Sequence, residues 1–161
     1  MKAVVFYYSY SGKTKLVAEA LGRSLRAEVR EIKEVKKRGV LGAYFFGGRD
    51  ALRGKSSEIQ PCNTDLKGFD MVLIGTPIWA GRPTPAVNAL LAKLDFTGKK
   101  VGAFVTLGGI GLASALKAFT DSISSRGGKV AATASYRSMK IKKEAVDGLI
   151  QEFAAKLTKY Q

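Results

Sequence analysis

A hydroxyl-rich loop near the start of the chain has residue types and spacing suited to holding phosphate. The loop, Ser9–Thr14 (Ser-Tyr-Ser-Gly-Lys-Thr), follows the apolar run Ala3–Tyr8 and leads into a helical pattern that begins near Lys15. Its side-chain hydroxyls can donate hydrogen bonds, and Gly12 lets an anion approach the backbone. A helix start adds N–H groups without intrahelical partners and the positive end of a dipole. The loop therefore predicts a phosphorylated ligand, with a plain turn and helix cap as the structural alternative.

The Gly-Lys-Thr ending of this loop also invites comparison with the P-loop of nucleoside triphosphatases. That motif needs a second glycine five residues before Gly12. Tyr7 occupies that position. The spacing therefore argues against an ATPase or a GTPase.

Two further loops carry residues that could contact a flat ring. The loop Thr76–Pro85 contains the only tryptophan, Trp79, and its prolines restrict the backbone. The loop Leu107–Gly111 contains three glycines, which leave backbone N–H groups accessible to a polar heterocycle edge. The structural alternatives are a core tryptophan and a tight turn before a helix. As a dinucleotide fingerprint the glycine loop is weak, because its third glycine is missing.

These loops must be positioned by strands and helices, and the sequence alternates between the two. Five strands are predicted, mostly from short apolar runs: Ala3–Tyr8, Asp70–Gly75, Val101–Thr106 and Lys129–Tyr136, together with the short alternating segment Glu28–Lys33. Apolar residues at helical spacing follow Lys15 and Pro85, and recur over Leu112–Ile123 and Val146–Leu157. Alternation of this kind predicts a doubly wound parallel sheet with helices on both faces. Ligands of such sheets bind beyond the carboxyl ends of the strands, where the three loops would lie.

Composition bounds the chemistry further. We expect residues 1–161 to form a single domain, and no apolar stretch is long enough to span a membrane. The start of the chain does not read as a signal peptide, so a cytoplasmic location is expected. Cys62 is the only cysteine and histidine is absent, which argues against disulfides, multi-cysteine metal sites and histidine-assisted nucleophiles. Any enzymatic chemistry then points to a cofactor.

The three loops together resemble the flavodoxin family, including the flavodoxin-like NAD(P)H and quinone reductases. The resemblance covers most of the chain in order, and it implies the strand order 2-1-3-4-5 and a noncovalent FMN. Ser9–Thr14 resembles the family loop around the FMN phosphate, Gly75–Gly81 the loop beside the isoalloxazine ring, and Thr106–Gly111 the loop at the polar edge of that ring. The implied cofactor-binding residues are Ser9, Tyr10, Ser11, Gly12, Lys13, Thr14, Thr76, Pro77, Ile78, Trp79, Ala80, Gly81, Leu107, Gly108, Gly109 and Gly111.

Two features depart from the electron-carrier members of this family. The chain carries a net charge of +14, whereas many carriers are strongly acidic. The loop Leu107–Gly111 also lacks the tyrosine that many of them stack on the flavin. One flavin face is then open, or is covered by Tyr44–Phe46. These residues belong to an aromatic, glycine-rich segment, Val40–Gly48, that reads as a packed lid or as a substrate, partner or dimer surface, with a short helix expected over Tyr44–Leu52.

The sequence therefore supports an FMN-binding, flavodoxin-like redox protein that transfers electrons through the flavin. An FMN-dependent NAD(P)H:quinone-type reductase is the alternative within that class. Expected partners are an acidic redox protein or a small-molecule electron donor or acceptor, and a homodimer stays open. A basic nucleic-acid or phosphoanion binding module is the alternative from another class. It accounts for the charge but leaves the three loops unexplained, and no nucleic-acid motif accompanies the charge.

Overall fold

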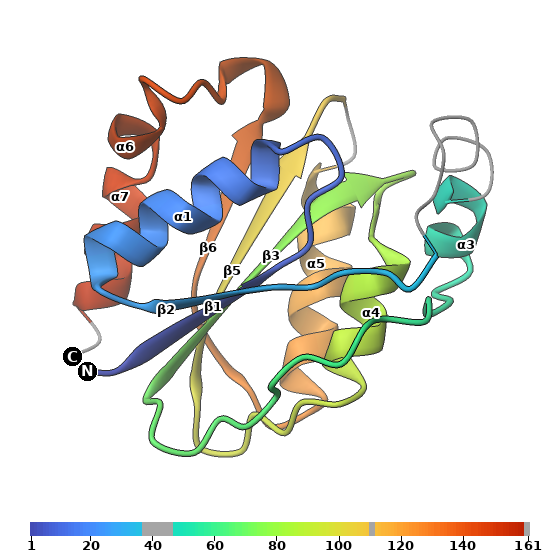
Figure 1. Cartoon of the computed structure of the whole chain (residues 1–161), viewed down its shortest axis with the longest axis horizontal. Coiled ribbons are helices and arrows are strands. Elements are labelled where there is room, and N and C mark those ends of the chain that lie inside the picture. Colours follow the sequence, from blue (N-terminus) through green and yellow to red (C-terminus); the bar gives the residue numbers. More distant parts are fainter. Residues whose placement is uncertain (37–46, 110–111, 160–161) are drawn as a thin grey trace.

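The computed structural model describes residues 1–36, 47–109 and 112–159, and it shows a mainly parallel sheet with helices on both faces (Figure 1). The strands run in the order β2-β1-β3-β5-β6, and the short β4 pairs antiparallel with β3. Their bounds are β1 Ala3–Tyr7, β2 Glu28–Glu31, β3 Met71–Trp79, β4 Arg82–Pro83, β5 Lys100–Leu107 and β6 Lys129–Arg137. With the two-residue β4 set aside, this is the expected order 2-1-3-4-5.

The helices lie on both faces of the sheet. Their bounds are α1 Lys13–Leu25, α3 Gly48–Leu52, α4 Pro85–Leu91, α5 Leu112–Ser124, α6 Val146–Leu149 and α7 Gln151–Thr158, and a 3₁₀ helix, η2, spans Ser138–Lys140. One face packs against α1, α6 and α7, and the other against α4 and α5 (Figure 1). No helix among the described residues is long and apolar enough to cross a membrane.

Side chains along each strand point alternately to the two faces of the sheet, and in β1 both sets are apolar. In β1, Val4 and Phe6 face the core under α4 and α5, whereas Ala3, Val5 and Tyr7 face the core under α1 and α7. All five side chains are buried. Successive side chains of a strand point to opposite faces, so a sheet covered on both sides needs an unbroken apolar run. The runs in the sequence therefore located the strands correctly.

Gly75 shows how the centre of the sheet is packed. It pairs with Phe104 across β3 and β5, and a Cβ at Gly75 would collide with the Phe104 ring. Phe104 is itself fully buried under α7, where its ring meets Phe153 edge to face. The last residue of the expected strand Asp70–Gly75 thus leaves room for a large aromatic neighbour.

The structure differs from the sequence expectations in three places. The strand β3 continues to Trp79, through residues that read as loop, and turns back into β4. Pro77 and Pro83 obscured this hairpin, because proline in a run argues against a strand. The expected C-terminal helix is divided at Ile150 into α6 and α7. The helix expected over Tyr44–Leu52 is found as α3, while residues 44–46 lie outside the described part.

Candidate functional site

A cavity of about 630 Å³ lies at the edge of the sheet where β1, β3 and β5 end. Each of the three predicted loops contributes to its wall. The lining residues are Tyr10, Ser11, Gly48, Pro77, Ile78, Trp79, Ala80, Thr106, Leu107, Gly108, Gly109 and Ser138. Nine of these residues belong to the set expected from the sequence, and the other three are Gly48, Thr106 and Ser138.

The first loop presents an open helix start. Gly12 is the N-cap of α1, with φ 81°, and has no side chain with which to cap the helix. The first intrahelical bond runs from the Leu16 N–H to the Gly12 carbonyl, and the Ser9 hydroxyl accepts from the Lys15 N–H at 3.2 Å. The N–H groups before Lys15 therefore precede the regular helical bonding and can serve an anion. A positive φ at Gly12 is what lets the chain turn into the helix without a side chain over these groups.

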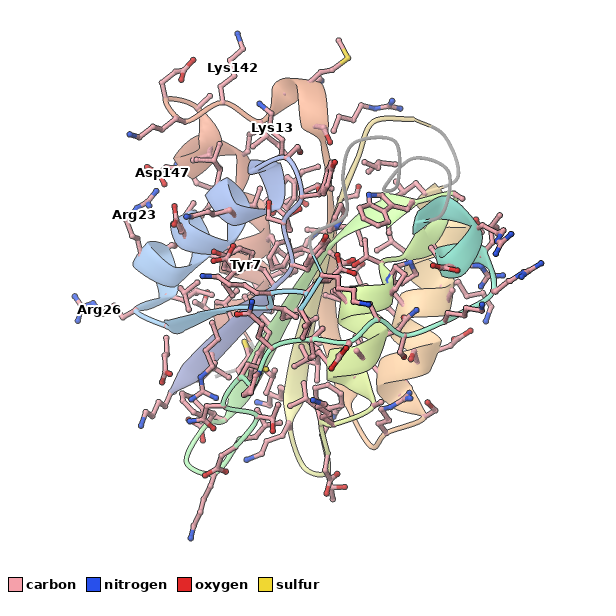
Figure 2. All side chains as sticks on the ribbon, turned by 45° about the vertical axis from the view of Figure 1, so that its right-hand side comes forward. Tyr7, Lys13, Arg23, Arg26, Lys142 and Asp147 are labelled. Atoms are coloured by element: carbon pink, nitrogen blue, oxygen red, sulfur yellow. The ribbon has the colours of Figure 1, made fainter. Side chains whose placement is uncertain are left out.

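Two side chains of this loop are tied to the scaffold. The Thr14 hydroxyl is buried and lies 2.8 Å from the Thr106 hydroxyl of β5. The Lys13 ammonium donates to the Ile141 carbonyl at 2.7 Å, and Figure 2 shows Lys13 at the start of α1, away from Arg26 at its other end. These bonds fix the start of α1 against β5 and against the segment after η2. Thr14 can meet a ligand through its backbone N–H, and Lys13 brings a positive charge to the same region.

The second loop is a rigid hairpin that carries Trp79. Trp79 pairs with Arg82 across β3 and β4, and the turn residues Ala80 and Gly81 have φ values of 48° and 73°. Tyr8 and Tyr10 approach the Trp79 ring edge on, with centroids at 6.1 and 5.7 Å. The ring is therefore held in one orientation by aromatic contacts on its periphery.

The hairpin is also closed against the chain that precedes α3. A Cβ at Gly47 would lie 2.7 Å from Cζ3 of Trp79, so only glycine permits this approach. Inside the hairpin, the Thr76 hydroxyl lies 3.1 Å from the Thr84 hydroxyl and accepts from the Thr84 N–H at 3.2 Å. Thr76 thus braces the hairpin from within, and Gly81 forms its turn beside the cavity wall.

The third loop gives the cavity an unobstructed backbone edge. Gly108 and Gly109 are exposed, and no heavy atom lies within 4 Å of the position where a Cβ would stand on either residue. Gly111, the last residue expected in the site, lies outside the described residues together with Ile110. The described part of this loop can offer N–H groups to a polar ring edge, as the sequence predicted, and no aromatic side chain stands in it.

Three lining residues were not expected from the sequence. Gly48 is the first residue of α3, Thr106 the penultimate residue of β5, and Ser138 the first residue of η2. Ser138 follows β6, which ends at the same edge of the sheet as β5. Because all parallel strands end at one edge, the segment after Lys129–Tyr136 was the available signal for Ser138. Gly48 had no such signal, since α3 reaches the cavity only through tertiary packing.

The cavity wall carries no charged side chain among the described residues. Its polar groups are hydroxyls and backbone amides, and its apolar surface comes from Ile78, Trp79 and Leu107. Below it, burial raises the pKa of Tyr7 to about 12, with Glu31 and Glu19 adding to the effect, so this phenol stays neutral. Burial likewise raises the pKa of Tyr136. A neutral, partly aromatic hollow beside the start of a helix fits a flat heterocycle with a phosphate tail.

Comparison with solved structures places the fold among the flavodoxin-like flavoproteins. A flavoprotein from Lactobacillus acidophilus, solved in complex with FMN, is 26% identical over 91% of this chain and 97% of its own, with a TM-score of 0.73. A flavoprotein from Bacteroides uniformis is 22% identical, covering 93% and 97% of the two chains with a TM-score of 0.76. Flavodoxin 1 from Bacillus cereus covers 100% and 99% at 19% identity and a TM-score of 0.65.

Residues 1–136 match the family of NADPH-dependent FMN reductases, and the chain belongs to this family. A comparison with curated protein sequences gives no significant match. Family membership and fold confirm the sequence prediction of an FMN-binding, flavodoxin-like redox protein. They leave the individual FMN contacts and the electron donor to be inferred from the geometry.

Proposed function

We propose that the chain is an FMN-dependent oxidoreductase that takes electrons from NADPH and holds FMN in the cavity at the sheet edge. The observation that carries the proposal is the convergence of the three loops on one neutral hollow next to the open start of α1. FMN supplies the chemistry, which is transfer of a hydride or of single electrons. The residues of the chain bind it, orient it and limit what reaches it.

The phosphate end belongs at the loop Ser9–Thr14. The N–H groups at the start of α1 and the hydroxyls of Ser9 and Ser11 are the donors there. Lys13 adds a positive charge, while its bond to the Ile141 carbonyl keeps its ammonium near η2. Binding of this kind depends mainly on backbone geometry, because the lining itself is uncharged.

The ring end belongs between the hairpin and the loop of Gly108 and Gly109. Trp79 offers an apolar surface whose orientation is fixed by Tyr8 and Tyr10. The exposed amides at Gly108 and Gly109 are placed for hydrogen bonds to the polar edge of the ring. The described part of this loop holds no aromatic side chain that would block a nicotinamide or a quinone from the opposite face.

A pure electron carrier is the second candidate, because the flavodoxins of Bacillus cereus share the fold. Family membership favours the reductase, and the lack of an aromatic side chain in the described part of the loop Leu107–Gly111 is consistent with it. Rapid oxidation of NADPH by the FMN-loaded protein with a quinone acceptor supports the reductase. Reduction of the bound FMN only through an added protein reductase would establish the carrier instead.

The nucleic-acid or phosphoanion module remains testable by a simpler measurement. We expect the purified protein to be yellow, with flavin absorbance bands, or to bind added FMN stoichiometrically. A colourless protein that ignores FMN and binds DNA or RNA with a steep salt dependence would overturn the proposal.

A further inference from the structure

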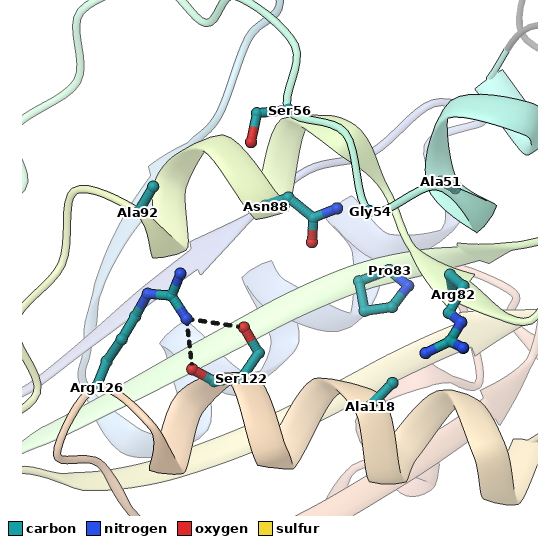
Figure 3. A pocket seen from close by; sticks show the side chains of 10 residues that line it. All are labelled: Ala51, Gly54, Ser56, Arg82, Pro83, Asn88, Ala92, Ala118, Ser122 and Arg126. Atoms are coloured by element: carbon teal, nitrogen blue, oxygen red, sulfur yellow. Dashed lines mark hydrogen bonds between the residues drawn. The ribbon is translucent and has the colours of Figure 1, made fainter.

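A second hollow, the α4–α5 groove, is also bounded by the β3–β4 hairpin. It has a volume of about 260 Å³ and runs between α4 and α5, with the segment after α3 along its rim (Figure 3). Two guanidinium groups, those of Arg82 and Arg126, stand at its two ends. Ala51, Ala92 and Ala118 form much of the remaining wall. These small side chains leave the space that larger residues would fill.

Arg126 follows the end of α5 by two residues, and its side chain is oriented by bonds back to that helix. Its Nη1 donates to the Ser122 carbonyl at 2.8 Å and lies 3.0 Å from the Ser122 hydroxyl (Figure 3). A guanidinium has five N–H donors, and these contacts use only one nitrogen. The donors on Nε and Nη2 have no hydrogen-bond partner among the described residues. Arg126 can therefore present these donors, already oriented, to an anion.

Arg82 supplies the second positive charge. It lies in β4, is exposed, and forms no ion pair with a described carboxylate. The groove wall contains no acidic residue. The nearest acidic side chain on the facing helix α5, Asp121, accepts from Lys117 at 2.6 Å instead. Two arginines thus flank one hollow, and no carboxylate of the described residues forms an ion pair with either of them.

Asn88 and Ser122 add neutral polar groups to the same wall. The Asn88 amide donates to the Lys55 carbonyl at 3.2 Å, which fixes its orientation at the groove. Two guanidinium groups with hydroxyl and amide neighbours are the donor set that suits a phosphate oxygen cluster. A role for Arg126 as a cap of α5 explains its bonds to Ser122 but leaves Arg82 and the hollow unexplained.

We propose that the α4–α5 groove binds the phosphate group of a small ligand. Its volume is below the usual range of about 300–1,000 Å³ for whole small-molecule sites, so it suits a phosphate with part of its carrier. The groove and the flavin cavity share walls: α3 contributes Gly48 to the cavity and Ala51 to the groove, and the hairpin contributes Trp79 and Arg82 respectively. A ligand anchored in the groove would therefore contact two elements that also bound the flavin cavity.

Two sources of phosphate fit this chemistry: the phosphorylated adenosine end of NADPH, or an unrelated phosphate-bearing metabolite. The link to NADPH rests on the proposed function, whereas phosphate binding itself does not. Phosphate binding is therefore measured directly, and the link to NADPH is measured separately through the KM values.

The test uses the FMN-loaded protein and two probes, inorganic phosphate and 2′,5′-ADP, titrated by calorimetry. We expect saturable binding of 2′,5′-ADP. Arg82→Gln should weaken it about tenfold or more, as expected for one lost charge-assisted contact. Ala118→Leu should abolish it by filling the groove without changing the charge. The matched control Lys117→Gln, which removes one charge from the same helix beside the groove, should change affinity less than about twofold.

The outcomes separate cleanly. Absence of saturable binding of both probes, or equal weakening by Lys117→Gln and Arg82→Gln, overturns the proposal. If Arg82→Gln raises the KM for NADPH and leaves that for NADH unchanged, the electron donor supplies the phosphate. If it removes 2′,5′-ADP binding and leaves both KM values unchanged, the phosphate-binding site stands and serves another molecule. FMN content and melting temperature, measured on every variant, exclude a general loss of structure.

Discussion

The cavity at the sheet edge and the α4–α5 groove are both bounded by the β3–β4 hairpin, yet their walls differ in charge. The cavity wall is uncharged, and the anion-binding groups proposed for it are the N–H groups at the nearby start of α1. The groove wall contains two guanidinium groups and three alanines. The first arrangement recognises shape and backbone geometry, and the second recognises charge.

The difference shows that a net charge of +14 need not act where the cofactor binds. Backbone N–H donors are fixed in place by the fold and bind an anion through direct hydrogen bonds. Exposed side-chain charges are screened within about 10 Å at ordinary ionic strength. Two anion sites in one chain should therefore respond differently to mutation and to salt, and four predictions test this contrast.

The largest effect is expected from a negative charge at the start of α1. Gly12→Asp adds a carboxylate beside the FMN phosphate, at a cost of about 3 kcal/mol for charges 5–6 Å apart at an effective dielectric near 20, or about a hundredfold in affinity. Titration of FMN fluorescence measures it. Gly98→Asp is the matched control, because Gly98 also has a positive φ, 74°, and open space around it. Equal losses in both variants would mean that backbone strain, and not the anion site, is responsible.

A smaller effect is expected from the ring side of the cavity. Trp79→Ala removes the apolar surface and the contacts to Tyr8 and Tyr10, and should weaken FMN binding about tenfold. Trp79→Phe should recover part of the loss. The same fluorescence titration applies, together with the shape of the visible flavin bands. Unchanged affinity and bands in Trp79→Ala would place the ring elsewhere in the cavity.

Salt should separate the two sites by a few-fold. Raising the ionic strength from about 0.05 to 0.5 M should weaken binding of 2′,5′-ADP to the groove several-fold more than binding of FMN to the cavity. Calorimetry on the FMN-loaded protein gives the first affinity, and fluorescence on the cofactor-free protein gives the second. Parallel salt slopes would erase the proposed distinction between backbone and side-chain recognition.

The smallest effect concerns Lys13. Lys13→Gln removes a positive charge near the phosphate end of FMN, which should lower the midpoint potential of bound FMN by on the order of 30 mV, or about 1.4 kcal/mol for two electrons. Lys15→Gln is the control, because the exposed Lys15 carries the same charge but its Nζ pairs with Oε1 of Glu19 at 3.8 Å. Potentiometric titration decides. A larger shift in Lys15→Gln would point to the overall charge of the chain as the cause.

Strand positions could be predicted because they depend on local signals, whereas the strand order came from the family resemblance. The runs around Val72 and Phe104 are apolar at every position, which only a sheet covered on both faces requires. The hairpin of β3 and β4 could not be predicted in this way. Its pairing of Ile78 with Pro83 uses a residue that normally argues against strands, and it is stabilised by contacts with Gly47, more than thirty residues earlier.

The binding sites also differ in how far local sequence signals could predict them. The loops around Ser11, Trp79 and Gly108 each follow a recognisable strand, so the topology rule for parallel sheets brought them together in advance. The α4–α5 groove had no such signal. Arg82 and Arg126 are 44 positions apart, and nothing local distinguishes them from the other basic residues of the chain. Only the packing of α4 beside α5 places them around one hollow.

The aromatic setting of Trp79 has a practical consequence. Trp79 is the sole tryptophan, so all indole emission of this protein arises from the wall of the flavin cavity. Its ring is held by Tyr8 and Tyr10, which should give a single narrow emission band in the empty protein. A bound isoalloxazine absorbs in the same region and would quench that emission by energy transfer. The chain thus contains its own optical reporter of cofactor occupancy, without any added label.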